Sequence, residues 1–309
     1  MRIKILGSAA GGAFPQWNCG CSNCSRVRRG ALRGKRRSQA QVAVSNSGKS
    51  WYLLNASPDL RSQIETSPEL HPQAAAIRET PISGIVLSSG DVDAVLGLLL
   101  LREFQPLNVY ATGSIRRILQ DNSIFNVLQR TPEQVLWNDI HAGTNFELTS
   151  PNGLTSGIVC KAMALRGSYP GYVSRDAQTQ LAGDEAILGL TLTGESGKRL
   201  LYIPSLPQLD AALVSAMEQS DLLLIDGTFW ADDELTRTRG QGPSAREIGH
   251  LPIGGDGGTL QTLACLKRPR KIYIHVNNTN PVLDEDSSEY RQVREAGWEV
   301  AEDGWEFQL

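Results

Sequence analysis

The chain lacks the features that mark several large classes of protein. Its 30 Lys and Arg residues against 33 Asp and Glu residues give a net charge of −3, so it has no excess of positive charge for nucleic acid. No apolar run reaches membrane-spanning length, and glycines interrupt the first apolar segment too early for a signal peptide. We therefore expect a cytoplasmic protein with no nucleic-acid or membrane partner.

Histidine and cysteine are scarce, with four and five residues among 309. In a reducing compartment, five cysteines do not predict a disulfide framework. Cys160 and Cys265 lie in apolar segments, which predicts packed core thiols. No linker divides the chain, so we predict a single domain over residues 1–309.

The other three cysteines form a C-x-C-x-x-C motif in a loop near residues 19–24. Cys19, Cys21 and Cys24 can converge on one tetrahedral soft cation, because the glycine and serine between them let the loop fold back. The alternative, three unpaired thiols, would leave oxidisable sulfur exposed. We interpret the motif as a structural zinc site whose fourth ligand comes from elsewhere in the chain.

The segment 87–94 follows an apolar strand predicted over 82–86 and leads into an apolar stretch, 95–103, that we expect to form a long helix. Acids at i and i+2 beside a strand end, here Asp91 and Asp93, can hold a cation at the carboxyl edge of a buried sheet. On a polar surface loop the same residues would only be solvated. The local pattern leaves both interpretations open.

Strand-like and helix-like segments alternate along both halves of the chain. This alternation predicts an α/β protein with two mixed sheets packed face to face and helices outside. The expected strands are 3–6, 41–45, 51–55, 82–86, 107–111, 158–165, 188–193, 199–204, 221–226, 271–276 and 298–301, and the later helices are near 207–218, 258–267 and 285–296.

Polar residues end two strands of the second half. Asp226 follows four apolar residues, His275 is placed in the same way, and His250 follows a loop rich in glycine. A lone histidine in such a place more often makes a structural hydrogen bond. Together with Asp91 and Asp93, however, these residues favour a shared metal or acid–base pocket.

Several segments of the chain carry a family resemblance, and the longest are ILGSAAGG at 5–12 and HVNNTNP at 275–281. They are similar to the coenzyme PQQ synthesis protein B family of the metallo-β-lactamase-fold superfamily. The resemblance extends over nearly the whole chain and implies an αββα sandwich with its active site along one edge. The matching segments are 5–12 with 15–19, 55–59, 97–103, 226–228, 249–250 and 275–281.

The resemblance also implies ligands and an activity. It implies a structural zinc on the three cysteines, with Asn278 as fourth ligand, because related phosphodiesterases carry one three residues after the active-site histidine. The implied activity belongs to the biosynthesis of pyrroloquinoline quinone (PQQ). It is an iron- and oxygen-dependent hydroxylation of the tyrosine ring in a cross-linked Glu-Tyr intermediate. The partner is then a small molecule derived from a Glu-Tyr peptide, or PQQ itself, and a homodimer is compatible with the sequence.

The chain departs from the family at one metal position. The superfamily motif is H-x-H-x-D-H, and here Ser89 and Asp91 stand at its first two histidines while Asp93-Ala94 replaces the final Asp-His pair. The resemblance assigns Asp93 and His275 to an active-site Fe(II), and we place Asp91 with them as a further metal ligand. A facial triad of two histidines and one carboxylate would suit this chemistry. The methyl group of Ala94 cannot coordinate, so Asp91, Asp226, His250 or water would have to complete the site.

Further roles follow from the same comparison. We predict that His250 is a general acid or base and that Asp226 orients it or joins the metal shell. Arg166 follows a strand where hydrolytic members of the fold carry a metal histidine. It would bind carboxylates of the substrate or form a surface salt bridge. The alternative function is a non-catalytic, transport-associated carrier for PQQ or its precursor, silent because of Ala94.

Overall fold

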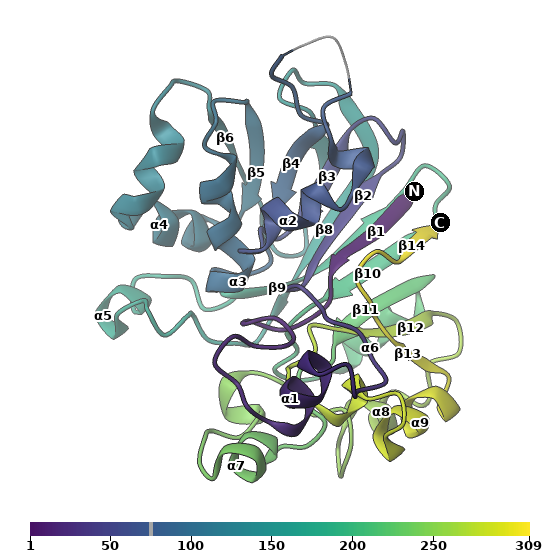
Figure 1. The fold of residues 1–309 in the computed structure, drawn as a ribbon. Helices are drawn as coiled ribbons and strands as arrows, with labels where there is room; N and C mark the ends of the chain where they lie inside the picture. Colours follow the sequence, from purple (N-terminus) through teal and green to yellow (C-terminus); the bar gives the residue numbers. More distant parts are fainter. Residues whose placement is uncertain (74–76) are drawn as a thin grey trace. The chain divides into compact units, whose positions relative to one another are not determined.

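The structure is a computed structural model that describes residues 1–73 and 77–309 (Figure 1). Its chain contacts form two compact units, each built from separate stretches of sequence. Unit 1 comprises Met1–Leu6, Gln41–Lys198 and Gly304–Leu309, and unit 2 comprises Gly7–Ala40 and Arg199–Asp303. The strands belong to two mixed sheets of seven, so the predicted α/β class is confirmed. The single domain stays a prediction.

Unit 1 contains one complete seven-stranded sheet, in which β2 and β3 form the expected antiparallel hairpin and β3 to β6 run parallel. The sheet has the order β14 (Glu306–Gln308), β1 (Arg2–Gly7), β2 (Gln41–Ser45), β3 (Trp51–Leu54), β4 (Ile82–Val86), β5 (Leu107–Ala111) and β6 (Val135–Asp139). Three antiparallel strands complete the sheet structure of this unit, namely β7 (Asn145–Thr149), β8 (Thr155–Leu165) and β9 (Ile187–Thr193).

Strand β5 shows how the two layers of unit 1 meet, because its alternate side chains face opposite sides of the sheet. On one face, Tyr110 stacks on Phe146 of β7 with ring centroids 5.6 Å apart, and Nδ2 of Asn108 donates to the carbonyl of Thr149 at 2.6 Å. On the other face, Val109 belongs to an apolar core shared with the helices. Unit 1 is therefore a β-sandwich covered by helices.

The helices of unit 1 are short, and α2 and α4 flank the strands β3 to β6 (Figure 1). Thr112 caps α4 by accepting a hydrogen bond from the backbone N–H of Ile115. The helices are α2 (Leu60–Glu65), η1 (Pro68–Leu70), α3 (Val92–Val95), η2 (Leu96–Leu101), α4 (Gly113–Asp121), η3 (Ser123–Gln129) and α5 (Arg175–Gln178).

Unit 2 contains four parallel strands, β10 (Arg199–Ile203), β11 (Leu222–Asp226), β12 (Arg270–Ile274) and β13 (Trp298–Val300). Asp226 pairs in register with Ile274. Because parallel strands end at the same edge, Asp226 and His275 are neighbours. The helices are α1 (Ser22–Arg28), α6 (Ala211–Glu218), α7 (Glu234–Arg239), η4 (Arg246–Ile248), α8 (Thr259–Thr262), η5 (Pro281–Leu283) and α9 (Ser288–Glu295).

Two expectations from the sequence were wrong. The long helix over 95–103 is instead the short α3 followed by the 3₁₀ helix η2, whose Gly97 lies against the backbone of Ala56 and Ser57. Cys160 is buried as expected, but Cys265 is exposed. Among the residues described, no helix has the length and apolar character needed to cross a membrane.

We predict that Gly97→Ala destabilises the protein by about 2–3 kcal/mol, because overpacking a tight site costs roughly this much. A Cβ at residue 97 would lie 2.2 Å from the carbonyl oxygen of Ser57, and backbone cannot move aside as a flexible side chain can. Urea unfolding measures the change. Gly183→Ala is the matched control, because no heavy atom lies within 4 Å of its added Cβ; equal stability of the two variants would contradict the prediction.

Candidate metal and acid–base site

The turn over residues 275–281 follows β12 in unit 2 and carries residues of both candidate clusters. His275 begins it with a φ of 61°, a left-handed conformation that is uncommon for residues other than glycine. Backbone bonds hold this conformation, because Val276 donates to the carbonyl of Ser8 and Asn277 donates to the carbonyl of Thr228, each at 3.0 Å. His275 thus combines a strained backbone with a predicted role in the metal or acid–base pocket.

Asp226 lies at the centre of the first cluster and is fully buried. Its Oδ2 accepts hydrogen bonds from the backbone N–H of Leu206 at 2.8 Å and from Nδ1 of His250 at 2.7 Å. Its Oδ1 accepts from the backbone N–H and the hydroxyl of Thr228 at 2.9 and 2.6 Å. Four donors occupy the two carboxylate oxygens, so the described contacts suit an orienting carboxylate better than a metal ligand.

The pKa of Asp226 is lowered although burial by itself would raise it. The charge and hydrogen bond of His250, the charge of His275 and the hydrogen bond of Thr228 all favour the ionised form and outweigh the loss of solvation. The site therefore contains a buried negative charge between two imidazoles.

His250 and His275 stack with ring centroids 5.6 Å apart and planes at 21°. The side chain of His250 is 14% exposed, and the edge of Phe229 covers one side of its ring. The potential ligand atoms of Asp226, His250 and His275 lie within 4.8 Å of one another. The structure thus brings together three residues that the sequence predicted for one pocket.

The second cluster comprises Cys19, Cys21, Cys24 and Asn278. The three sulfurs lie within 4.8 Å of one another, whereas tetrahedral zinc with bonds of about 2.3 Å would hold them about 3.8 Å apart. Backbone N–H groups point at two of them: Cys21 donates to Sγ of Cys19 at 3.4 Å, and Cys24 donates to Sγ of Cys21 at 3.5 Å. This arrangement can hold a soft divalent cation with little rearrangement.

Two thiols of this cluster have opposite pKa shifts. For Cys19, burial raises the pKa, but hydrogen bonds from Cys21, Cys24 and Asn278 outweigh it and lower the pKa. For Cys24, burial dominates and raises the pKa to about 12. A bound cation would have to displace the proton of Cys24, so metal affinity at this cluster should rise with pH.

Asn278 faces all three sulfurs. Its Nδ2 lies 3.1 Å from Cys19 Sγ, 3.7 Å from Cys21 Sγ and 3.4 Å from Cys24 Sγ. A half-turn of the amide exchanges Nδ2 for Oδ1 without changing its shape. Asn278 can therefore complete a metal shell through oxygen or donate hydrogen bonds to thiolates through nitrogen.

Four residues near the clusters were not predicted from the sequence. Thr228 joins Asp226 to both histidines, and Asn23 and Asn280 join the cysteine loop to the 275–281 turn. The only signal for Thr228 was its place in the triplet Asp226-Gly227-Thr228. There, a Cβ on Gly227 would lie 2.7 Å from the Cβ of Tyr273, so the strand end needs a glycine.

Glu234 is the fourth residue that was not predicted from the sequence. It is a buried acid at the start of α7. Its Oε2 accepts from the backbone N–H of Trp230 at 2.6 Å, and its Oε1 accepts from the hydroxyl of Thr279 at 2.5 Å. Burial is the main cause that raises its pKa to about 7. Glu234 therefore exchanges a proton near neutral pH next to the 275–281 turn.

The remaining predicted residues belong to unit 1. Asp91 and Asp93 lie half-buried at the start of α3, and Oδ2 of Asp91 accepts from the hydroxyl of Ser89 at 2.8 Å. Arg166 is exposed directly after β8, and within the described residues no ion pair to it is found. The proposed grouping of Asp91 and Asp93 with His275 stays a prediction.

Ala94 is 4% exposed and belongs to the apolar core of unit 1. Its carbonyl accepts from the backbone N–H of Ala56 at 2.6 Å, which fixes the α3 turn against the 55–57 loop. Tyr172 adds a contact that the sequence did not predict, because its hydroxyl donates to the carbonyl of Gly90 at 2.5 Å. The pKa of this tyrosine is raised to about 12, mainly by burial and to a smaller extent by the charge of Asp91.

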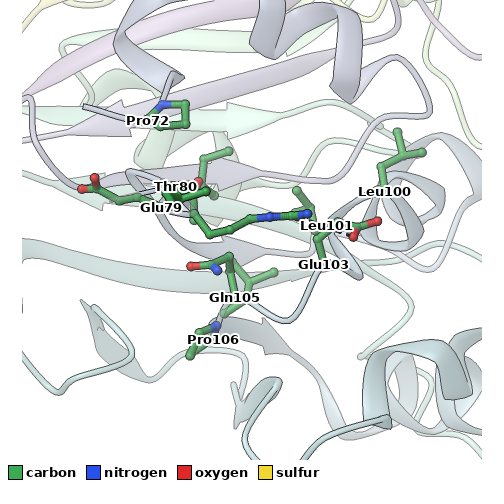
Figure 2. A pocket seen from close by; sticks show the side chains of 12 residues that line it. Pro72, Glu79, Thr80, Leu100, Leu101, Glu103, Gln105 and Pro106 are labelled. Atoms are coloured by element: carbon green, nitrogen blue, oxygen red, sulfur yellow. Dashed lines mark hydrogen bonds and ion pairs between the residues drawn. The ribbon is translucent and has the colours of Figure 1, made fainter. Parts of the chain in front are cut away.

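A cavity of about 230 Å³ in unit 1 is a different kind of feature. Figure 2 shows its mainly apolar wall, which includes Leu100 and Leu101, with Glu79 and Glu103 to either side in this view. Among the described residues that line it there is no histidine, no cysteine and no member of the two clusters. It therefore offers no acid–base or metal-binding group beyond two carboxylates and is not the candidate site.

Comparison with known proteins gives consistent results along the chain. A model of the beta-lactamase superfamily domain matches residues 50–276. Coenzyme PQQ synthesis protein B of Rhodopseudomonas palustris (strain BisB5) is 42% identical over 314 residues, covering 100% of both chains. The protein of the same name from Gluconobacter oxydans (strain 621H) is 41% identical over 309 residues, covering 99% of this chain and 98% of the relative.

A solved structure agrees with the sequence relatives. The crystal structure of Zn²⁺-bound PqqB from Methylobacterium extorquens has a TM-score of 0.92 and 38% sequence identity, and the match covers 100% of both chains. The predicted metallo-β-lactamase-like fold is confirmed by this similarity and by the superfamily match.

We predict that Glu234 makes folding less favourable as pH rises. Its folded-state pKa of about 7 exceeds the ordinary 4.5, so between these values the folded state holds a proton that the unfolded state has lost. The free energy of unfolding should then fall by about 3 kcal/mol across this range and stay constant above it. Glu234→Gln should remove this dependence in urea unfolding measured from pH 4.5 to 8.

The control for this experiment is Glu295→Gln, which removes one exposed negative charge from α9. It should keep the pH dependence of the unaltered protein. Parallel pH curves for the unaltered protein and Glu234→Gln would contradict the prediction.

Proposed function

The chain belongs to the coenzyme PQQ synthesis protein B family of the β-lactamase superfamily, and from that premise we propose a specific reaction in PQQ biosynthesis. The protein hydroxylates the tyrosine ring of a cross-linked Glu-Tyr intermediate, using Fe(II), oxygen and an external two-electron reductant. One oxygen atom enters a ring C–H bond, and the other leaves as water with the two electrons and two protons. The observation that supports this proposal is the hydrogen-bonded network of Asp226, Thr228, His250 and His275.

The proposed site has the donor types of non-haem iron sites, but one imidazole where the facial triad has two. His275 is the imidazole ligand, and Asp91 and Asp93 stay the predicted carboxylate ligands. Imidazole and carboxylate are the donors of non-haem iron oxygenases. His275 is held by Thr228 and by backbone bonds on both sides of its strained φ, so its ring needs little reorganisation to bind a cation. When bound, iron supplies the activation of oxygen.

His250 and Asp226 supply proton transfer in this proposal. His250 donates Nδ1–H to Asp226 at 2.7 Å, so Nε2 is the atom that takes a proton from a phenolic hydroxyl of the substrate. The buried carboxylate of Asp226 then stabilises the imidazolium that forms. Arg166, an exposed cation, is proposed to bind carboxylates of the substrate.

We also propose that Cys19, Cys21 and Cys24 hold a structural zinc with Asn278. The support is their geometry in unit 2 and the fact that the Methylobacterium extorquens relative was solved with Zn²⁺ bound. Three thiolates and one further ligand match the tetrahedral shell of structural zinc sites.

A carrier for PQQ or its precursor is the second candidate function, and Ala94 is the observation that favours it. Its methyl group is buried in the apolar core, where it supplies no ligand beside Asp93. A protein that binds the quinone tightly without turnover would not need that ligand.

We predict that the purified protein contains about one zinc per chain and that Cys21→Ser loses it. Serine is a good N-cap for α1, so this change removes a ligand while keeping the helix. Asn278→Ala should lower zinc affinity by at least about 10-fold, as expected for loss of a metal-shell partner, whereas Asn278→Asp should retain zinc. Elemental analysis and competition with a chelator measure the effects.

The matched control is Cys265→Ser, because Cys265 is exposed and lies outside the cluster. Its zinc content should equal that of the unaltered protein. Full zinc occupancy in Cys21→Ser with unchanged affinity would rule out the assigned site.

Restoring a histidine at residue 94 separates enzyme from carrier. The hydroxylase proposal predicts that the unaltered protein takes up Fe(II) and consumes oxygen when the cross-linked Glu-Tyr substrate and a two-electron reductant are both present. Ala94→His should increase iron affinity by more than the roughly 10- to 100-fold typical of outer-shell changes. Ala94→Leu is the size control, because it adds similar bulk to the core without a ligand.

Oxygen electrode traces and iron analysis decide between the two functions. If the unaltered protein binds PQQ but consumes no oxygen at saturating Fe(II), and only Ala94→His gains turnover, the carrier function holds and the hydroxylase proposal is wrong.

A further inference from the structure

Thr228 contacts all the other residues of the first cluster through a single side-chain oxygen. Thr228 lies two residues after Asp226, the last residue of β11, and is 3% exposed. Its hydroxyl oxygen contacts four polar atoms: Oδ1 of Asp226 at 2.6 Å, Nδ1 of His275 at 2.8 Å, the carbonyl oxygen of His275 at 2.9 Å and Nδ1 of His250 at 3.2 Å.

Counting hydrogens decides the direction of these bonds. A threonine hydroxyl has one hydrogen to donate and two lone pairs to accept with. The carboxylate of Asp226 and the carbonyl of His275 can only accept, so they compete for that one hydrogen. The shorter bond to a charged acceptor is the stronger, which assigns the hydroxyl hydrogen to Asp226.

We infer that Thr228 is a positioning residue that keeps a hydrogen on Nδ1 of His275, and so makes Nε2 the nitrogen whose lone pair can bind a cation. With its own hydrogen given to Asp226, the hydroxyl can hold Nδ1 of His275 at 2.8 Å only as an acceptor. Nδ1 must then be the donor.

His250 is oriented in the same sense by a different group. Its Nδ1 lies 2.7 Å from Oδ2 of Asp226 and only 3.2 Å from Thr228, so the carboxylate is its main acceptor. This difference in acceptor suits His250 to proton transfer and His275 to cation binding, an assignment that deepens the proposed function and rests on it.

Nuclear magnetic resonance of [¹⁵N]histidine-labelled protein tests the inference. Long-range ¹H–¹⁵N spectra at pH 8, above the ordinary histidine pKa of about 6.5, show which ring nitrogen carries hydrogen. His250→Gln and His275→Gln assign the signals among the four histidines, and His71 and His141 serve as internal controls. The full-length protein is measured as purified, with no substrate added.

The expected result is a hydrogen on Nδ1 of His275 in the unaltered protein and in Thr228→Ser, which keeps the hydroxyl. Thr228→Val has nearly the same shape but no acceptor, so its His275 signal should shift toward the form with hydrogen on Nε2. A hydrogen on Nε2 alone in the unaltered protein overturns the inference, as does a Thr228→Val spectrum identical to that of the unaltered protein.

The unaltered protein and Thr228→Ser decide the question even where Thr228→Val does not fold. The spectra require no turnover, so failure of the hydroxylase proposal would leave the position of the hydrogen on His275 as a separate result. If the protein hydroxylates its substrate but His275 carries its hydrogen on Nε2, only the positioning role inferred for Thr228 is wrong.

Discussion

The buried amide of Asn280 is the interaction on which the arrangement of unit 2 depends. Its Nδ2 donates to the carbonyls of Gly227 and Thr228 at 3.0 and 3.3 Å, and its Oδ1 accepts from the backbone N–H of Val282 at 3.1 Å. Its backbone carbonyl accepts from Asn23 of α1 at 2.9 Å. One fully buried residue thus joins the end of β11, the helix after the cysteine loop and the 275–281 turn, and removing it would leave several buried groups unpaired.

Because of this junction, the two clusters are mechanically connected although their chemistry differs. The turn places His275 beside Thr228 at one end and Asn278 beside three sulfurs three residues later. A cation on the cysteines would fix the position of Asn278, and the short turn then limits how far His275 can move. A cation bound at the proposed zinc site would therefore restrict the position of His275 through the rigidity of the turn.

The sequence predicted those features that depend on local spacing or on strand ends. The C-x-C-x-x-C loop and the adjacency of Asp226 and His275 follow from such rules. It did not predict Thr228 or Glu234, because their roles arise from burial and from partners distant in sequence. The apolar run after Asp93 indicated one long α-helix, but the segment is a short α-helix that continues as a 3₁₀ helix, in which Gly97 packs on a neighbouring loop.

The two histidines of unit 2 have different main acceptors, Asp226 for His250 and Thr228 for His275. In unit 2 a single carboxylate, Asp226, has all four of its acceptor positions occupied by hydrogen bonds, two of them from Thr228. An Asp committed in this way orients His250 and is less available to bridge two metal ions. In unit 1, Ser89 and Asp91 stand at the first two histidine positions of the superfamily motif, which is why the proposed function uses one metal ion and not the two of metal-assisted hydrolysis.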